Sequence, residues 1–372
     1  HEKTGSSAAR VVRAWFTNDN DSFEGLLAQL ADSVNKESRD APQPLCPSLA
    51  ALETMPDQHA LSAVLFSRRK DALLADGRLS NEDSAWFLSC CQFNAGSWLN
   101  SIPSLGCFQV GSIEFRTMLR IRLGLKLACA ERVTCCKCEA PVAPSFKNGR
   151  HWMTVCRNSH RTLLHNGTRD LIAKMYRALG VAAETEVRGL YLQLTSHGEY
   201  KPADVLLPAS ATGEGRAWAL DVAYVDPTSQ TSLGYQSHKR ALAATKKRYQ
   251  EKMTSHRKQA EAAGAEGLLF VKKPLVFEAT GGMSEETQKW WESVLALERD
   301  RREPGDPTSL RELGLEHTFS ANKFSTMWLQ KISMGYARAQ AESVLCLIGK
   351  NSNSNGAGSG CMQAHGAGES VD

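Results

Sequence analysis

The sequence predicts an α/β fold in which helices flank a mixed sheet, preceded by a mostly helical region. Apolar residues recur at helical spacing over residues 165–179, and a glycine follows where that helix would end. Four short runs rich in apolar residues predict strands, and they cover residues 190–194, 204–207, 218–225 and 268–277. A long basic helix over 236–263 is predicted between the last two strands. The order helix, three strands, helix, strand favours an α/β core with a mixed sheet.

The regions outside this core carry mainly helical patterns. Apolar spacing indicates short helices early in the chain, and longer ones at 59–75, 112–123, 284–297 and 322–348. From Asn351 the composition is dominated by Ser, Gly, Asn and Ala, which predicts a disordered tail. The predicted division is a helical region (1–130), a metal knuckle (131–160), the α/β core (161–300), a helical extension (301–350) and the tail (351–372).

Composition and charge exclude some classes of protein. Apolar residues make up 42% of the 372 residues, enough for real cores, and charged residues make up an ordinary 23%. The net charge of +4 is too mild to identify a partner. No apolar run approaches the roughly 18 residues of a membrane span, and the N-terminus lacks an apolar signal core. Neither membrane insertion nor secretion is therefore expected. Because the chain begins with His1 rather than Met, we expect a fragment or a processed piece of a longer protein.

Cysteines cluster in one short window of the chain. There are eleven in total, an odd number that, without an export signal, argues against a disulfide framework. Cys135 and Cys138 form a Cys-x-x-Cys pair. His151 follows after twelve intervening residues, and Cys156 after four more. Two tight pairs of sulfur and nitrogen ligands suit a structural tetrahedral Zn²⁺, so we expect a zinc knuckle. Two neighbours remain alternative ligands: Cys136 and His160.

Two aspartates lie on neighbouring predicted strands. Asp204 enters one strand, and Asp221 lies seventeen residues later inside the apolar run of the next. An unpaired carboxylate inside such a run is costly, so Asp221 needs a counterion or a metal. Two carboxylates, with water and a substrate phosphate, suffice to hold Mg²⁺. Glu184 and Glu186 precede the first strand, and we take Glu186 as a further catalytic candidate. Acidic residues at strand ends also occur on ordinary surfaces, which is the simpler interpretation.

A basic stretch follows the second aspartate. Residues 237–258 contain eight Lys or Arg and one Glu. Such a stretch is a candidate phosphate-contacting face, and a solvated helix face is the alternative. The members that we expect to contact nucleic acid are Lys239, Arg240, Lys247, Arg248 and Lys252.

A series of further short motifs runs along the chain. In order, they are Ser97–Ser104, Glu114–Arg116, Leu119–Leu125, the knuckle, His165–Asn166, Arg169–Asp170, Lys201–Asp204, Asp221–Val222, Lys246–Tyr249 and Glu278–Gly282. Each motif is weak by itself, but their order is specific. The chain resembles the C-terminal region of the polyproteins of retrotransposons without long terminal repeats, in those members that carry a restriction-endonuclease-like domain. The resemblance covers about half of the chain.

The resemblance implies a nuclease core of the PD-(D/E)xK type, whose two acidic positions map onto Asp204 and Asp221. A lysine usually follows the second Asp by two residues, but that position is Ala223 here. In this family the lysine comes from the next helix, in a Lys-x-x-Lys-Tyr pattern that this chain matches with a shift of one residue. We favour Lys246 as the catalytic lysine, because helical spacing places it on one face with Tyr249.

The implied function is that of an endonuclease that nicks target DNA for insertion of a retroelement. We therefore expect Zn²⁺ as a structural ion and Mg²⁺ as the catalytic ion. The expected partners are DNA, with RNA as an alternative, and a reverse transcriptase upstream in the same polyprotein, in the nucleus. Two other interpretations stay open. One is a nucleic-acid-binding module whose nuclease centre has decayed, and the other is a zinc-stabilised scaffold without a nucleic-acid role.

Overall fold

The computed structural model describes residues 58–75, 77, 79–125, 127, 161–187, 190, 203–262, 270–302 and 309–353. The chain divides into two compact units, residues 1–79 and 80–372. Within the first unit, the described element is helix α4 (Gln58–Ala75), which confirms the helix predicted at 59–75. The helices predicted before residue 58, the knuckle and the tail beyond residue 353 lie outside the described residues.

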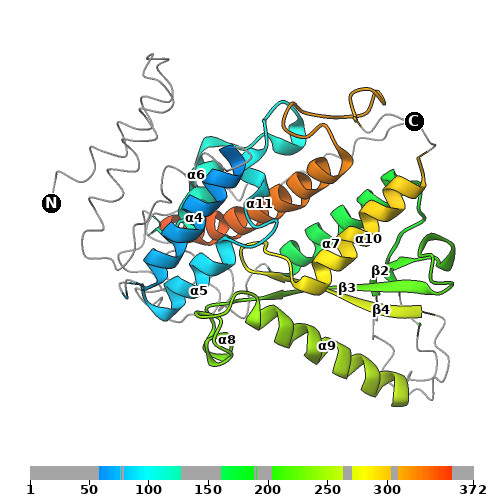
Figure 1. Ribbon diagram of the computed structural model, residues 1–372, viewed down its shortest axis with the longest axis horizontal. Coiled ribbons are helices and arrows are strands. Elements are labelled where there is room, and N and C mark those ends of the chain that lie inside the picture. Colours follow the sequence, from blue (N-terminus) through cyan, green and yellow to red (C-terminus); the bar gives the residue numbers. More distant parts are fainter. Residues whose placement is uncertain are drawn as a thin grey trace. The chain divides into compact units, whose positions relative to one another are not determined.

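The second unit is built on a mixed sheet of four strands (Figure 1). The strands are β1 (Glu184–Val187), β2 (Ala203–Leu207), β3 (Ala217–Val225) and β4 (Phe270–Glu278). Their order in the sheet follows the chain. The pairings of β1 with β2 and of β2 with β3 are antiparallel, whereas β3 pairs with β4 in parallel. The predicted α/β architecture, a mixed sheet flanked by helices, is confirmed.

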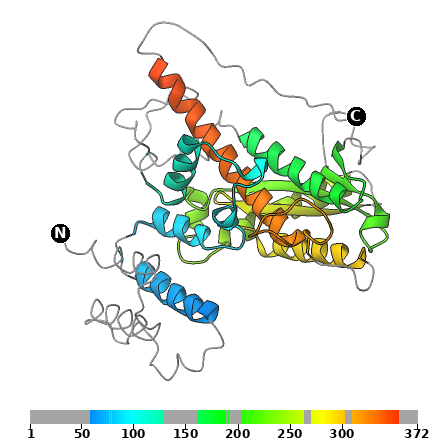
Figure 2. The same ribbon diagram turned by 90° about the horizontal axis from the view of Figure 1, so that it is seen from above.

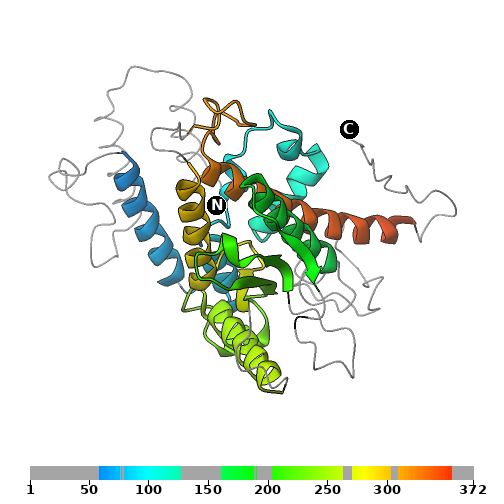
Figure 3. The same cartoon turned by 90° about the vertical axis from the view of Figure 1, so that its right-hand side faces the viewer.

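Different helices cover the two faces of this sheet (Figures 1 and 3). Helices α7 (Arg161–Ala178) and α10 (Glu285–Asp300) lie on one face, and α9 (Ala243–Ala262) lies on the other. Residues alternate along β3 accordingly: Leu220 and Val222 pack in the main core with α7, whereas Ala219 packs on the α9 face. Asp221 follows Ala219 by two positions, so its side chain lies on the same face of the sheet, the face covered by α9.

The helices on the first face end and begin at the signals that the sequence carries. α7 is followed by Gly180, whose φ of +71° is a left-handed conformation that glycine adopts without strain. α10 begins after Ser284, whose side-chain oxygen accepts a hydrogen bond from the backbone N–H of Thr287 at 3.1 Å.

The long α11 (Phe324–Asn353) contacts both α7 and the upstream helix α6, and it runs between them (Figure 2).

The segment before the sheet contributes to the same core. It comprises α5 (Asn81–Cys90), the short 3-10 helices η1 (Ser97–Asn100) and η2 (Gly106–Phe108), and α6 (Ser112–Arg122). Trp98, Phe108 and Met118 from this segment are buried in one cluster with side chains of α7 and β3. These upstream helices and the sheet therefore form one packing unit.

The basic helix is shorter than predicted. Instead of one helix over 236–263, the chain forms α8 (Gln230–Gly234) and then α9. Gln236 and Leu242 lie between them with φ values of +64° and +61°. Left-handed residues interrupt a right-handed helix, and the apolar period alone does not reveal them. The regular helix therefore begins only at Ala243, and helical spacing can be applied from that residue onward.

The first strand also differs from the prediction. β1 lies at Glu184–Val187, whereas the sequence favoured residues 190–194. Residue 190 is in a turn, and 191–194 lie outside the described residues. β1 is at the edge of the sheet and has a polar sequence, so its apolar signal is weak. Between β2 and β3 the chain makes the 3-10 helix η6 (Ala209–Ala211).

Candidate active site

A cavity of about 440 Å³ lies beside the second half of β3. Residues of α7, α9 and α11 and of the loop after β4 line it. Both predicted aspartates, Asp204 and Asp221, are among the lining residues. A third carboxylate, Asp226, lines the same space, as do the side chains of His165, Arg248 and Lys252. The cavity therefore gathers acidic and basic groups from four separate parts of the chain.

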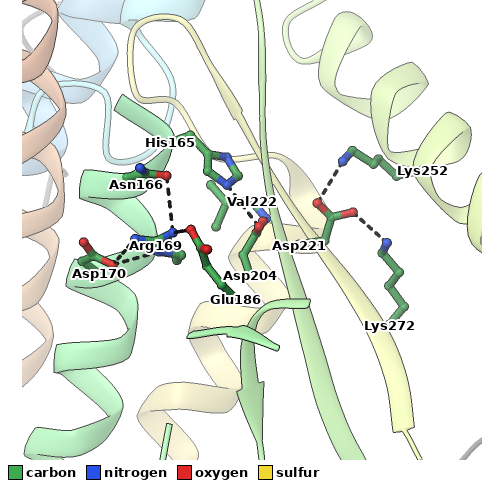
Figure 4. Close-up of polar contacts among 10 residues, drawn as sticks. All are labelled: His165, Asn166, Arg169, Asp170, Glu186, Asp204, Asp221, Val222, Lys252 and Lys272. Carbon is green, nitrogen blue, oxygen red and sulfur yellow. Dashed lines mark hydrogen bonds and ion pairs between the residues drawn. The ribbon is translucent and has the colours of Figure 1, made fainter. Parts of the chain in front are cut away.

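Asp204 is held in place from two sides (Figure 4). One carboxylate oxygen, Oδ1, lies 3.1 Å from Nε2 of His165 in the first turns of α7. The other, Oδ2, accepts a hydrogen bond from the backbone N–H of Val222 on the neighbouring strand at 2.7 Å. Asp204 thus joins the start of β2 to both β3 and α7, and its two hydrogen bonds fix the direction of its carboxylate.

Asp221 is buried on the opposite side of β3 between two ammonium groups. Nζ of Lys252, from α9, lies 2.8 Å from Oδ1, and Nζ of Lys272, from β4, lies 2.9 Å from Oδ2. Burial by itself raises the pKa of Asp221, but the charges of Lys272 and Lys252 outweigh burial and hold the pKa below its usual value. Asp221 therefore stays ionised in a position where an unpaired carboxylate would be costly.

The two aspartates line the same cavity, but their carboxylates point in different directions. In Figure 4, Asp204 points toward His165, whereas Asp221 points toward Lys252 and Lys272. The prediction that they lie on neighbouring strands is confirmed. That they share one cation stays a prediction.

Glu186, the third predicted carboxylate, does not line this cavity in the described structure. It forms an ion pair with Arg169 of α7, which also pairs with Asp170 and contacts Asn166 (Figure 4). Its φ of +55° is left-handed, a strained conformation for a residue with a side chain. The ion pair with Arg169, whose side chain is 11% exposed, links β1 to α7, and a catalytic role for Glu186 stays a prediction.

The structure places Lys252, and not Lys246, beside the aspartates. Lys246 is exposed and lines a separate cavity of about 490 Å³ with Tyr235 and Glu286. The sheet-facing side of α9 carries Thr245 and Lys252, which are two turns apart. Helical spacing groups Lys246 with Tyr249 but does not say which side of the helix packs on the sheet; that side carries Thr245, and Lys246, one residue later, is turned from it by about 100°.

The predicted nucleic-acid contacts divide into two groups. Lys239 and Arg240 are exposed in the connection before α9, and Lys247 and Arg248 are exposed on α9 itself. Lys247 lies 5.6 Å from the centre of the Tyr235 ring, and Arg248 pairs with Glu251 at 3.2 Å. Lys252 does not belong to this exposed set, because its ammonium group is directed into the cavity and bound to Asp221.

Lys272 was missed in the sequence, although a signal for it exists. It follows Phe270 by two positions in an apolar strand, so strand alternation directs both side chains to the same face. Its side chain is 5% exposed. A lysine buried that deeply needs a carboxylate partner, and Asp221 in the neighbouring strand is the carboxylate that needs a cation.

The described residues form no group of three or more His, Cys, Asp or Glu side chains placed to hold a metal ion, and both oxygens of Asp221 are bound by ammonium groups. Asp204 and Asp221 supply the hard oxygen ligands that Mg²⁺ prefers, and Mg²⁺ usually keeps several waters and binds through one or two carboxylates. The four predicted zinc ligands, Cys135, Cys138, His151 and Cys156, lie outside the described residues.

No family model matches this chain, and no curated protein matches it. Nor does any helix in the described part of the chain combine the length and apolar character needed to cross a membrane.

Proposed function

We propose that residues 161–300 are the core of a Mg²⁺-dependent DNA endonuclease of a retroelement. The observation that carries the proposal is the meeting of Asp204 from β2, Asp221 from β3 and Lys252 from the following helix at one cavity. The sequence resemblance implies two strand aspartates and a lysine supplied by the next helix. Lys252 comes from that helix and contacts the second aspartate directly, although it follows Tyr249 by three residues and lies outside the Lys-x-x-Lys-Tyr pattern.

Each side chain has a distinct role in the proposed reaction. Asp204 and Asp221 would hold Mg²⁺, whose chemistry is to acidify a water molecule and to offset charge on the scissile phosphate. His165 and the N–H of Val222 orient Asp204. Lys252 places a positive charge beside Asp221, where it can offset the charge that develops on the phosphate during hydrolysis.

The exposed basic residues around the start of α9 support a role in holding the DNA. Phosphate contacts position a protein on DNA, so charge is needed there rather than a defined geometry. We propose that Lys239, Arg240 and Lys247 belong to this surface and that the zinc knuckle extends it. On the same resemblance, the chain would act in the nucleus, next to a reverse transcriptase of the same polyprotein, on DNA, with RNA as the alternative partner.

Nicking of a supercoiled plasmid with and without Mg²⁺ tests this proposal. Asp204→Asn, Asp221→Asn and Lys252→Met should each reduce nicking by about 10²-fold or more, because each removes a group that acts on the reacting phosphate. Lys258→Met, an exposed change on the same helix, is the matched control and should nick like the wild type. DNA affinity in EDTA should stay within a few-fold for all four variants. Nicking that survives in Asp221→Asn would rule the proposed site out.

A second candidate function is supported by the pairing of Asp221. Both of its carboxylate oxygens are already bound by ammonium groups, as expected of a structural ion cluster. The chain would then bind nucleic acid without cleaving it. In that case the wild type would show salt-dependent DNA binding but no nicking with Mg²⁺ or Mn²⁺, and Asp221→Asn would lower the free energy of unfolding without changing DNA affinity.

A further inference from the structure

A second cavity, of about 490 Å³, lies beside the beginning of α9. One wall is the connection between α8 and α9, and another is the first turn of α10 (Figure 1). The connection follows β3 and α10 follows β4, so both walls lie beyond the carboxyl ends of the two parallel strands. Ligands of α/β proteins commonly bind at this end of parallel strands. The charged and aromatic residues that line the cavity are Tyr235, Arg240, Lys246, Lys247, Glu285 and Glu286.

Tyr235 brings an exposed aromatic side chain to this cavity. The residue is 39% exposed, yet its backbone is held on both sides. Its N–H donates a hydrogen bond to the carbonyl oxygen of Ser232 at 3.0 Å, at the end of α8. Two residues later, the buried hydroxyl of Ser237 donates to the carbonyl oxygen of Pro227 at 2.6 Å. A ring on a backbone held in this way offers a stacking surface at a low cost in conformational entropy.

Three cations surround this ring. Nζ of Lys247 lies 5.6 Å from its centre, within the roughly 6 Å over which a cation is attracted by the face of an aromatic ring. Arg240 and Lys246 are exposed, and neither forms an ion pair with a residue that the structure describes. Sites for unpaired nucleic-acid strands combine the same two features, an aromatic ring on which a base stacks and cations along the backbone phosphates.

Two carboxylates decide what kind of ligand fits. Glu285 and Glu286 belong to the first turn of α10 and line the same cavity. Their charges oppose a free phosphate ion, so the cavity is a poor site for an isolated anion. A nucleotide differs because its base also carries N–H donors, and an ionised carboxylate is an acceptor with two oxygens. Guanine presents two neighbouring N–H groups on its pairing edge, so it suits these carboxylates best.

We propose that this cavity holds one unpaired nucleotide of a DNA strand, with its base stacked on Tyr235 and its flanking phosphates beside Arg240 and Lys246. The base has to be unpaired, because neighbours cover both faces of a paired base in a duplex. That the strand is DNA rests on the proposed function. The nucleotide site itself rests on the ring, the cations and the carboxylates of the cavity.

The nucleotide site lies next to the candidate active site. Lys247 and Arg248 are consecutive residues of α9, and the first lines this cavity whereas the second lines the cavity of the two aspartates. One DNA strand can therefore contact both. The proposed substrate is a duplex that is interrupted by an unpaired nucleotide close to the position of the nick.

The experiment compares two fluorescently labelled duplexes of equal length, one fully paired and one with a single unpaired guanine. Fluorescence anisotropy with the full chain in EDTA gives both affinities. The wild type should bind the interrupted duplex about tenfold more tightly, as expected for the stacking of one base. Tyr235→Ala should remove this preference and leave the affinity for the paired duplex within a few-fold. Tyr235→Phe retains the ring and should retain the preference.

Phe319→Ala is the matched control, because Phe319 is a 96% exposed aromatic residue that does not line this cavity. It should keep the preference of the wild type. An unpaired thymine in place of guanine should give a smaller preference, since it offers a single N–H donor to the carboxylates.

Two results would overturn the site. A preference that survives in Tyr235→Ala would come from the greater flexibility of the interrupted duplex and not from stacking on the ring. A wild type that binds the two duplexes equally, or binds neither, would have no such site.

The outcome is separable from that of the nuclease proposal, because the binding assay contains no metal and measures no cleavage. A chain that prefers the interrupted duplex but does not nick DNA would lose the proposed activity and keep the nucleotide site. A chain that nicks DNA without this preference would lose only the nucleotide site.

Discussion

Glu278 is the last residue of β4, and it is 2% exposed. Its Oε2 has no hydrogen-bond partner among the described residues. Burial raises its pKa from 4.5 to about 7, a hydrogen bond from Ser89 opposes part of that rise, and the nearby charge of Asp226 adds to it. Above that pKa, Glu278 is a buried carboxylate with no cation bound to it among the residues that the structure describes, which is an unfavourable state.

Stability should therefore depend on pH through this one residue. Between pH 4.5 and 7 the folded chain retains a proton on Glu278 that the unfolded chain has lost, so the free energy of unfolding falls as pH rises across this window. Glu278→Gln removes the titration, and at pH 8 it should raise the free energy of unfolding by about 3 kcal/mol relative to the wild type. Urea unfolding at pH 5 and pH 8 measures this. Glu251→Gln, at an exposed position, is the control, and a wild type and Glu278→Gln that lose stability in parallel would contradict the prediction.

At the residue scale, the sequence identifies the aspartates but not their partners. Asp221 could be predicted because a carboxylate in an apolar strand demands compensation. Lys252 and Lys272 could not be assigned to it in the same way. The first depends on the rotational phase of α9, and the second reaches Asp221 from the strand that pairs with β3 in parallel. Both contacts are consequences of tertiary packing, and neither can be read from the spacing of residues along the chain.

At the element scale, α9 presents different chemistry on its two sides. The side toward the sheet holds Lys252 against Asp221, and the side toward solvent carries Lys246 and Lys247. The strands β2, β3 and β4 were predictable because their apolar runs are packed on at least one face. The start of α9 was not, because one left-handed residue at Leu242 resets the helix without changing the composition.

The solvent side of α9 should control the salt dependence of DNA binding. Replacing Lys246 and Lys247 together by Ala should reduce the slope of log affinity against log salt by up to about 0.9 for each phosphate that is no longer neutralised. The matched control is the double replacement of Lys174 and Lys289, which are exposed on α7 and α10. Fluorescence anisotropy on duplex DNA over a range of salt concentrations gives both slopes. Equal slopes in the two double variants would exclude this side of α9 from the interface.

The contact between α5 and the loop after β4 leaves no room for a side chain at Gly282. A Cβ there would lie 2.8 Å from Cβ of Gln92 and 3.4 Å from the carbonyl oxygen of Ser89. Both obstacles are close to the backbone, so they cannot swing aside. Gly282→Ala should therefore lower the free energy of unfolding by about 1–3 kcal/mol, as overpacking does.

Gly106→Ala is the matched control for this change, because an added Cβ at Gly106 meets no atom within 4 Å. Urea unfolding of the two variants under the same conditions makes the comparison. A Gly282→Ala variant as stable as Gly106→Ala would mean that α5 does not pack closely on this loop.

At the scale of the whole molecule, the unit from Ser80 onward should fold without the residues before it. It forms a compact unit of its own, and its core joins Trp98 and Phe108 to α7 and β3. A chain that starts at Ser80 should therefore unfold in one cooperative urea transition. A chain that starts at Arg161 lacks those core aromatics and exposes the apolar sides of α7 and α11, so its transition should be broad or absent. A cooperative transition in the shorter chain would show that residues 161–353 are sufficient for folding.

The parallel pairing of β3 with β4 has a kinetic consequence. Because β4 returns to β3 only after the crossover through α9, the pairing closes a long loop, and contacts between residues so distant in sequence form slowly. Asp221 lies on β3 and Lys272 on β4, so their ion pair cannot precede this closure. A partly folded chain with β4 undocked leaves the carboxylate of Asp221 hydrated and without Lys272, and α9 without the strand on which it mainly packs. The charge arrangement of the cavity is therefore expected to arise late in folding, and a growing chain would complete it only after β4 had been synthesised.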